Sequence, residues 1–281
     1  MQIIESISEM RQWGDWQRRE RQRIVLVPTM GFLHEGHLCL MREARSRGDL
    51  TVASIFVNPA QFGPAEDFAT YPRDFERDRQ LLEAEQVDVL FYPSEAQIYP
   101  AGAQTFVEVE KLSLPLCGAF RPGHFRGVTT VVAKLFNIVR PHVAIFGEKD
   151  YQQLQVIRRM VRDLSLDVEI VGHPIVREPD GLAMSSRNAY LTSAERQAAL
   201  CLSRVLRKAE CWVNRGEVKA ALLLERARAE LSNEPLVTVE YVKFCHPETL
   251  NDVDEVGEST LLALAVRIGK ARLIDNRVLK H

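Results

Sequence analysis

The sequence has no apolar run that approaches the roughly 20 residues a membrane-spanning helix requires. Its first residues, Met1-Gln2-Ile3-Ile4-Glu5, lack the basic region followed by an apolar stretch that marks an export signal. Positive charge is not in excess either, since the formal net charge of the 281 residues is −2, which disfavours a protein built mainly to bind nucleic acid. We therefore expect a soluble, cytoplasmic protein with no membrane and no nucleic-acid partner.

Paired cysteines and the common glycine motifs are also missing. The five cysteines are scattered and none belongs to a C-x-x-C pair, so reduced thiols are expected rather than a metal or redox centre. There is no Walker Gly-Lys-Ser/Thr, and the glycines do not fit the dinucleotide pattern G-x-G-x-x-G. Neither Ser185 nor Ser186 lies in a G-x-S-x-G turn, which disfavours a serine hydrolase.

Short apolar segments alternate with amphipathic ones through the first 175 residues. Continuous apolar segments suit strands of a parallel sheet that is covered on both faces. Expected strands lie at residues 24–27, 50–57, 87–92, 143–146 and 168–171, with a possible short strand at 106–109. Expected helices lie at residues 6–21, 37–47, 74–85 and 128–139, and a further helix follows the strand at 143–146 and runs to about residue 163. The pattern predicts an α/β fold: a Rossmann-like parallel sheet with helices on both faces.

The sequence changes character near Pro174. Beyond it we expect helices near residues 193–215, with Ser193 as the N-cap, and 218–231. Strands are expected near residues 237–244 and 261–266, and the segment 271–276 closes this part of the chain. The chain is therefore predicted to divide into a Rossmann-like domain, residues 1–175, and a smaller α+β domain, residues 176–281.

The first expected strand runs into a turn with Gly31 and Gly36 and then into a helix that opens at His37. A helix N-terminus presents unpaired backbone N–H groups and the positive end of its dipole, so this junction is a candidate phosphate site. His34 and His37 suggest catalysis as well as anion binding. Zinc is disfavoured because the two histidines are one residue too close for H-E-x-x-H and no third ligand is apparent, so no metal site is expected.

Further polar residues follow other expected strands. Asn58 and Gln61 come after the second strand, where open α/β sheets bind ligands, although Asn-Pro is also a common turn start. Lys149 follows the strand at 143–146 and opens a helix, where its charge opposes the dipole, so a ligand role is favoured. Arg121 and His124 flank Gly123 in a loop and are equally consistent with phosphate contact and with solvated charges.

These donors, namely imidazoles, a lysine, an arginine and hydroxyls, suit the stabilisation of charge on a transferring phosphate. No nucleophilic carboxylate accompanies them. From the residues alone, the chemistry is therefore that of nucleotide transfer.

Several motifs carry a family resemblance. His34-Glu35-Gly36-His37 resembles the H-x-G-H signature of the nucleotidylyltransferases and class I aminoacyl-tRNA synthetases, and Met184-Ser185-Ser186-Arg187-Asn188 resembles their second, mobile element. From about Ile3 to Asn276 the chain is similar to the pantothenate synthetase family, through the motifs VPTMG (27–31), FVNPAQF (56–62), RPGHF (121–125), FGEKDYQQ (146–153) and RLIDN (272–276).

The resemblance implies an AMP-forming ligase of pantothenate biosynthesis that joins (R)-pantoate to β-alanine through a pantoyl adenylate. It implies ATP as a substrate, with Mg²⁺ carried on its phosphates, a C-terminal lid that excludes water from the adenylate, and a homodimer. A different adenylyltransferase of the same group and a non-catalytic nucleotide-binding regulator are the alternatives. A synthetase acting on RNA is disfavoured by the small second domain and the net charge.

The resemblance also implies site residues, matched to the motifs of this sequence. Those implied in catalysis are His34, His37, Lys149 and Arg187, with His37 as the proton donor. Those implied in ATP binding are Met30, His34, His37, Gly147, Lys149, Asp150, Val176, Met184, Ser185, Ser186 and Arg187. Gln61 and Gln153 are implied to bind pantoate, and Gln61 also β-alanine.

Overall fold

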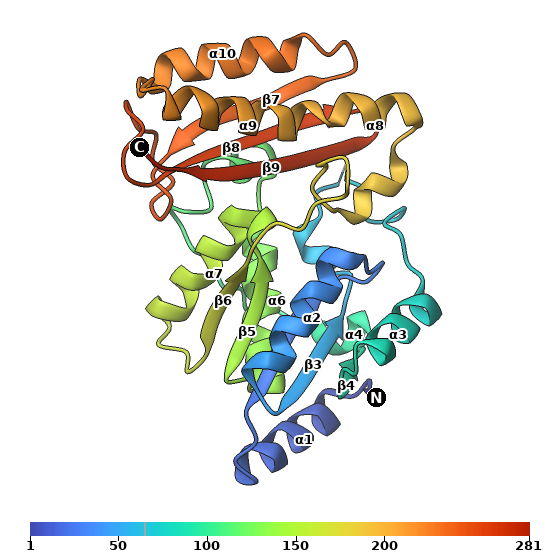
Figure 1. The fold of residues 1–281 in the computed structure, drawn as a ribbon. Coiled ribbons are helices and arrows are strands. Elements are labelled where there is room, and N and C mark those ends of the chain that lie inside the picture. Colours follow the sequence, from blue (N-terminus) through green and yellow to red (C-terminus); the bar gives the residue numbers. More distant parts are fainter. Residues whose placement is uncertain (65) are drawn as a thin grey trace. The chain divides into compact units, whose positions relative to one another are not determined.

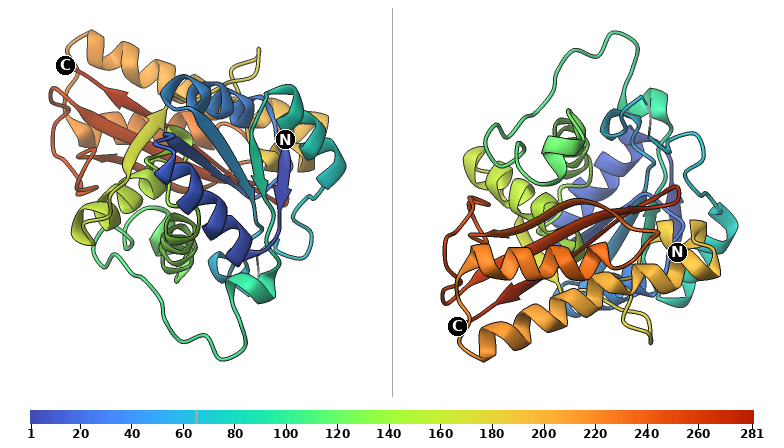
Figure 2. Two further views of the ribbon diagram at one scale, coloured as in Figure 1. Left: turned by 90° about the horizontal axis from the view of Figure 1, so that it is seen from below. Right: turned by 90° about the horizontal axis from the view of Figure 1, so that it is seen from above.

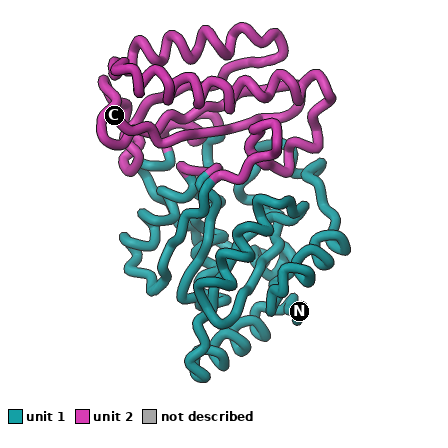
Figure 3. Tube along the Cα trace, viewed as in Figure 1, with its two compact units in different colours: residues 1–113, 121–148, 153–174 teal, residues 114–120, 149–152, 175–281 magenta. Residues whose placement is uncertain are grey.

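The computed structural model describes residues 1–64 and 66–281, which form two compact units (Figure 3). Unit 1 comprises residues 1–113, 121–148 and 153–174, and unit 2 comprises residues 114–120, 149–152 and 175–281. The short segments 114–120 and 149–152 thus belong with the C-terminal part of the chain. The sequence-based boundary between residues 175 and 176 remains a prediction.

A six-stranded sheet, parallel throughout, forms the centre of unit 1 (Figure 1). Its order is β1-β4-β3-β2-β5-β6. The strands are β1 Gln2–Ile4, β2 Ile24–Thr29, β3 Leu50–Ile55, β4 Val89–Phe91, β5 Val143–Gly147 and β6 Glu169–His173. The predicted parallel sheet is confirmed, with β1 added at its edge. The chain order reverses beside β2, since β3 follows on one side and β5 lies on the other.

Helices cover both faces of this sheet, as Figure 2 shows. They are α1 Ile7–Arg19, α2 Glu35–Arg47, α3 Phe75–Ala84, α6 His124–Val139 and α7 Tyr151–Asp163. Ile24 and Leu26 of β2 pack in a core with residues of α1, α6 and α7, whereas Val25 and Val27 pack with residues of α2 and α3. Alternate side chains of a strand point to opposite faces, so one apolar strand contributes to both cores.

Shorter helical turns lie at the ends of the strands and in the loops. They are η1 Pro59–Gln61, α4 Glu95–Ile98, α5 Cys117–Phe120, η2 Glu148–Asp150 and η3 Ser186–Tyr190. In the part of the chain that the structure describes, no helix combines the length and apolar composition needed to cross a membrane.

Unit 2 contains an antiparallel sheet, β7-β8-β9, formed by Thr238–Cys245, Thr260–Ile268 and Ala271–Leu279. Its helices are α8 Ser193–Ala199, α9 Cys201–Asn214 and α10 Ala220–Ser232. Leu202 and Val205 of α9 and Leu223 of α10 pack in one apolar cluster with Leu262 and Leu264 of β8. The predicted α+β character of this part is confirmed.

The single helix expected over residues 193–215 is wrong, because the chain forms two helices there. They are separated at Leu200, whose N–H donates to the Gln197 carbonyl over three residues instead of four. Ser193 is not the N-cap either. Thr192 caps α8 through a reciprocal pair of hydrogen bonds with Glu195, as in a capping box.

The short strand expected at residues 106–109 is also absent from the described residues. Threonine side chains of α6 satisfy this backbone instead. The Val107 N–H donates to Thr130 Oγ1 at 3.0 Å, and Thr129 Oγ1 donates to the Val107 carbonyl at 2.6 Å. A strand partner is therefore not needed to satisfy these partly buried polar groups.

Gly14 of α1 provides a test of the packing of α1 on α6. A Cβ at Gly14 would lie 2.7 Å from the backbone oxygen of Val139. Helix propensity alone predicts that Gly14→Ala stabilises the protein by about 1 kcal/mol. We expect the reverse, a loss of about 1–3 kcal/mol, because α1 must move away from α6.

Urea denaturation followed by circular dichroism measures this difference. Gln12→Ala, an exposed position on the same helix, is the control and should change the unfolding free energy by less than about 0.5 kcal/mol. A Gly14→Ala protein more stable than the unmodified one would contradict the expected close contact.

Candidate active site

A turn with two consecutive left-handed residues follows β2. Gly31 has φ +80° and Phe32 has φ +50°, a conformation that costs a residue with a Cβ about 1–2 kcal/mol. Asp78 of α3 holds this turn, because its carboxylate accepts the N–H groups of Phe32 at 2.6 Å and of Leu33 at 2.7 Å. The side chain of Asp78 is buried, with 1% of the residue exposed. The turn that delivers His34 is thus fixed by a carboxylate from another helix.

His34 and His37 lie side by side at the start of α2. His34 is the N-cap residue, and the ring centroids of the two histidines are 4.0 Å apart. The His34 backbone N–H donates to Nδ1 of His37 at 3.3 Å. Nδ1 of His37 is therefore an acceptor, and the proton of the neutral ring is carried by Nε2. Nε2 is thus the ring atom from which His37 can donate a hydrogen bond to a ligand.

Sequence reasoning missed Asp78. An aspartate in the first turn of a helix is explained by its favourable interaction with the helix dipole, so the sequence carries no signal of a second role. Burial raises the pKa of Asp78 above its ordinary value, although the N–H groups of Leu33 and Phe32 and the charge of Arg77 oppose this shift. Burial of the ionised carboxylate therefore costs free energy, and the hydrogen bonds to the turn partly offset this cost.

Gln61 lies in η1, beyond the end of β3, and is 8% exposed. Its Oε1 accepts a hydrogen bond from Nδ2 of Asn58 at 3.1 Å, and its Nε2 lies 3.1 Å from Sδ of Met30. Asn58, 1% exposed, also donates to the Gly127 carbonyl and accepts from the Tyr99 hydroxyl. The amide of Gln61 retains one hydrogen and one lone pair for a ligand, whereas Asn58 is committed to the protein.

Arg121 and His124 act on the backbone of Gln61. Nη2 of Arg121 and Nδ1 of His124 lie 3.3 Å and 2.8 Å from the Gln61 carbonyl oxygen. Since Arg121 can only donate, its Nη1, 3.0 Å from Nε2 of His124, makes that atom the acceptor and leaves the proton on Nδ1. The sequence left phosphate contact and solvated charge open for this pair; the structure places both side chains against Gln61.

Glu66 completes this group. Its carboxylate accepts hydrogen bonds from Nε of Arg121 at 3.0 and 3.1 Å, and the two side chains also form an ion pair. Burial by itself would raise the pKa of Glu66, but the hydrogen bonds and charge of Arg121 outweigh it and hold that pKa below its ordinary value. Glu66 is a second residue that sequence reasoning missed.

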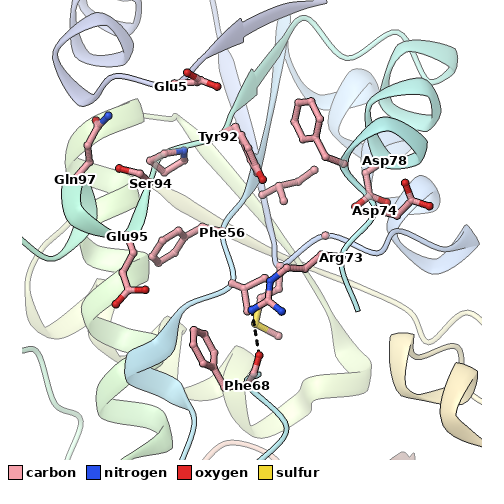
Figure 4. A pocket seen from close by; sticks show the side chains of 16 residues that line it. Glu5, Phe56, Phe68, Arg73, Asp74, Asp78, Tyr92, Ser94, Glu95 and Gln97 are labelled. Carbon is pink, nitrogen blue, oxygen red and sulfur yellow. Dashed lines mark hydrogen bonds between the residues drawn. The ribbon is translucent and has the colours of Figure 1, made fainter. Parts of the chain in front are cut away.

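A pocket of about 430 Å³ lies at the carboxyl ends of the strands of unit 1 (Figure 4). It shares Met30 and Gly31 with the turn after β2, and Asp78 lines it as well. Glu5 and Glu95 add further carboxylates to its lining, and Arg73, which also lines it, donates a hydrogen bond to the Phe68 carbonyl (Figure 4). His34, His37 and Gln61 do not line this pocket, whereas Met30, which is predicted to bind ATP, does.

Two further predicted residues of unit 1 lie at or just beyond the end of β5. Gly147 is its last residue, and Gln153 lies half-buried in the first turn of α7. β2 and β5 are neighbours at the point where the strand order reverses. The strand that ends at Gly147 therefore lies next to the strand that leads to His34. Open α/β sheets bind their ligands at such a point.

The remaining predicted residues belong to unit 2. Lys149 and Asp150 lie in η2, where Nζ of Lys149 is 3.8 Å from Oδ2 of Asp150. Val176 and Met184 are brought together by a hairpin, in which the Met184 N–H donates to the Val176 carbonyl at 3.0 Å. Ser185 then caps η3, which begins with Ser186 and Arg187, by accepting the Arg187 N–H at 3.3 Å.

Comparisons with known proteins agree on one family. The sequence model described as pantoate-beta-alanine ligase matches residues 2–278. The pantothenate synthetase of Geobacter sulfurreducens is 60% identical over 279 residues, which is 99% of both chains. That of Thermotoga neapolitana is 56% identical over 99% of this chain and 100% of the relative.

Solved structures give the same result. A crystal structure of pantothenate synthetase from Thermus thermophilus superposes with a TM-score of 0.94 at 47% identity, covering 99% of each chain. The pantoate-beta-alanine ligase of Francisella tularensis, in complex with beta-gamma ATP and beta-alanine, superposes with a TM-score of 0.81 at 35% identity, over 99% of this chain and 97% of the other.

Removal of the Asp78 carboxylate should release the turn. In Asp78→Ala the N–H groups of Phe32 and Leu33 lose their acceptor, and each buried N–H left unpaired costs about 1–3 kcal/mol. We expect their amide hydrogen exchange to become at least about tenfold faster. Asp74→Ala, which removes the N-cap of α3, is the control and should leave both amides protected. Unchanged exchange at both amides in Asp78→Ala would show that the turn holds itself.

Asp78 should also leave a pH signature in stability. Because burial raises its pKa, the native state holds the carboxyl proton more tightly than the unfolded chain does. The contribution of Asp78 to the unfolding free energy therefore falls as pH rises above the ordinary value of 3.8 and through the raised value. Asp78→Asn lacks this titration.

Denaturation of both proteins at a series of pH values between about 4 and 7 measures the effect. The unfolding free energy of the unmodified protein minus that of Asp78→Asn should decrease as pH increases. A difference that stays constant, or that increases with pH, would contradict the raised pKa.

Proposed function

The chain belongs to the pantoate-beta-alanine ligase family, and on this basis we propose which of its residues carry the reaction and how. It is an ATP-dependent ligase that forms the C–N bond of pantothenate from pantoate and β-alanine. The proposal is that the reaction has two steps with a pantoyl adenylate between them.

In the first step a carboxylate oxygen of pantoate attacks the α-phosphorus of ATP. The bond to the bridging oxygen breaks, and pyrophosphate leaves with the electron pair. In the second step the β-alanine amine attacks the acyl carbon of the adenylate, loses a proton and expels AMP. Charge develops on phosphate oxygens in the first step, so hydrogen-bond donors placed at those oxygens lower its barrier.

His37 is proposed as the donor to the phosphates. The observation that carries this role is the hydrogen bond from the His34 backbone to Nδ1 of His37, which leaves the ring proton on Nε2. The same two residues begin α2, whose N-terminal N–H groups and dipole favour a phosphate. His34, whose ring lies beside that of His37, is proposed to contact the same phosphates.

The other substrate contacts are proposed from the motifs that this chain shares with its family. Lys149, Ser185, Ser186 and Arg187 bind the triphosphate, and Met30, Gly147, Asp150, Val176 and Met184 line the nucleotide site. Gln61 and Gln153 hydrogen-bond pantoate, and Gln61 also β-alanine. The amide of Gln61 is buried and fixed by Asn58 and Met30. Such an amide discriminates strongly against substrate analogues that lack the matching polar group.

Mg²⁺ is proposed to be carried on the ATP phosphates. No group of three or more His, Cys, Asp or Glu side chains in the described part of the chain could hold a metal ion. The predicted site residues are mostly donors, which suit phosphate and not a cation, so phosphate oxygens and water would ligate Mg²⁺. A cytoplasmic homodimer remains a prediction from the sequence.

Substitution of the two central donors tests the proposal. His37→Ala and Lys149→Ala should each lower pantoate-dependent exchange of pyrophosphate into ATP by about 10²–10³-fold, the usual cost of one such donor. Thermal midpoints should stay close to that of the unmodified protein. His281→Ala and Lys280→Ala, at the exposed C-terminal end, are matched controls that should retain full exchange.

The unmodified protein decides between the alternatives. Release of AMP that requires both pantoate and β-alanine supports the ligase reaction. A dinucleotide product would indicate another adenylyltransferase, and ATP binding with no exchange would indicate a regulator. Near-normal exchange in both His37→Ala and Lys149→Ala would refute the site assignment.

A further inference from the structure

Asp275 and Asn276 are two adjacent buried polar residues in the middle of β9. They are 2% and 7% exposed, whereas Ala271, Leu273 and Leu279 of the same strand pack in the apolar core of unit 2. A carboxylate or amide inside a core costs free energy unless it is hydrogen-bonded, and an apolar pair would fill a strand without that cost. Both side chains therefore need hydrogen-bond partners inside the protein.

Asp275 holds the hairpin that joins Val176 to Met184. Its Oδ2 and Oδ1 accept from Nη1 and Nη2 of Arg177 at 2.7 and 2.9 Å, a two-pronged ion pair. Nη1 of Arg177 also donates to the Gly181 carbonyl at 3.1 Å, on the far side of the hairpin. One carboxylate thus ties both arms of the hairpin to β9, and this hairpin leads directly to Ser185.

Asn276 holds the other ATP-binding segment. Its Nδ2 donates to the backbone carbonyl of Lys149 at 3.0 Å, across 127 positions of sequence. Neighbouring side chains of a strand point to opposite faces. One step along β9 therefore serves two segments, the hairpin through Asp275 and η2 through Asn276.

We infer that Asp275 and Asn276 are positioning residues for adenylate formation: Asn276 orients Lys149 through its backbone, and Asp275 orients the Val176–Arg187 segment through Arg177. The inference rests on the proposed roles of Lys149 and of Ser185–Arg187 in binding the triphosphate. Neither Asp275 nor Asn276 touches a substrate in this scheme. An error of about 1 Å in the placement of a group in a site can cost about 10²-fold in rate.

The two half-reactions distinguish a role in positioning from a role in stability. A positioning residue affects only adenylate formation, whereas a loss of stability affects both half-reactions. Lys149 is needed while pyrophosphate leaves, but not when β-alanine attacks a finished pantoyl adenylate. Asn276→Ala should lower pyrophosphate exchange by about 10–100-fold. The rate of AMP release from supplied pantoyl adenylate and β-alanine should change by less than about threefold. Asn214→Ala, exposed at the end of α9, is the matched control and should change neither rate.

A double-mutant cycle with Lys149→Ala gives the sharper result. If Asn276 acts through Lys149, Asn276→Ala should add less than about twofold once Lys149 is removed. Losses that multiply in the double variant, equal losses in both half-reactions, or no loss in Asn276→Ala would overturn the inference. Thermal unfolding of each variant shows whether unit 2 is still folded.

Arg177→Lys tests the second contact without emptying the site. A lysine keeps the charge opposite Asp275 but cannot bridge both carboxylate oxygens and the Gly181 carbonyl. The KM for ATP should rise by about tenfold or more while the second half-reaction is retained; an unchanged KM would overturn the role of Asp275. Absence of pantoate-dependent pyrophosphate exchange in the unmodified protein would refute the proposed function itself. That measurement does not involve the variants of the double-mutant cycle, so the two failures are distinguishable.

Discussion

The burial of β2 on both faces is the constraint on which unit 1 depends. Its backbone is paired with β3 and β5, and its side chains are divided between two apolar cores. Such a strand can carry no chemistry along its length, because any polar side chain there would be cut off from water and from ligands. Polar function is therefore confined to the point where the strand ends, and Gly31, Phe32 and His34 lie there.

Buried polar residues fix the positions of the groups that follow the strand ends. Asp78 holds the turn before His34, Asn58 holds the amide of Gln61, and His124 holds the Gln61 carbonyl. None of these contacts is needed to fill space, and the raised pKa of Asp78 shows that burial opposes its charge. Pre-ordered donors cost no reorganisation during the reaction, which is the physical reason for keeping polar groups inside.

The errors of the sequence-based predictions share a cause. The segment 106–109 has the apolar alternation of a strand, but Thr129 and Thr130 supply hydrogen bonds that a neighbouring strand would otherwise have made. The helical periodicity of residues 193–215 continues through Leu200, so the break between α8 and α9 leaves no mark in the pattern. Both outcomes depend on residues that pack against the segment, which local periodicity does not describe.

The sequence by itself determined the parallel sheet and its helices, and it predicted which residues handle substrate. Continuous apolar strands leave few other folds, and histidine, lysine and amide residues after strand ends indicate a ligand edge. Only the tertiary structure decided which side chains hold these predicted site residues in place. Asp78, Glu66, Asp275 and Asn276 each hold a residue that lies far away along the chain. An aspartate that caps a helix and one that fixes the turn before His34 look alike in sequence. Hydrogen bonds between distant segments depend on how the chain folds back on itself, and that is set by packing.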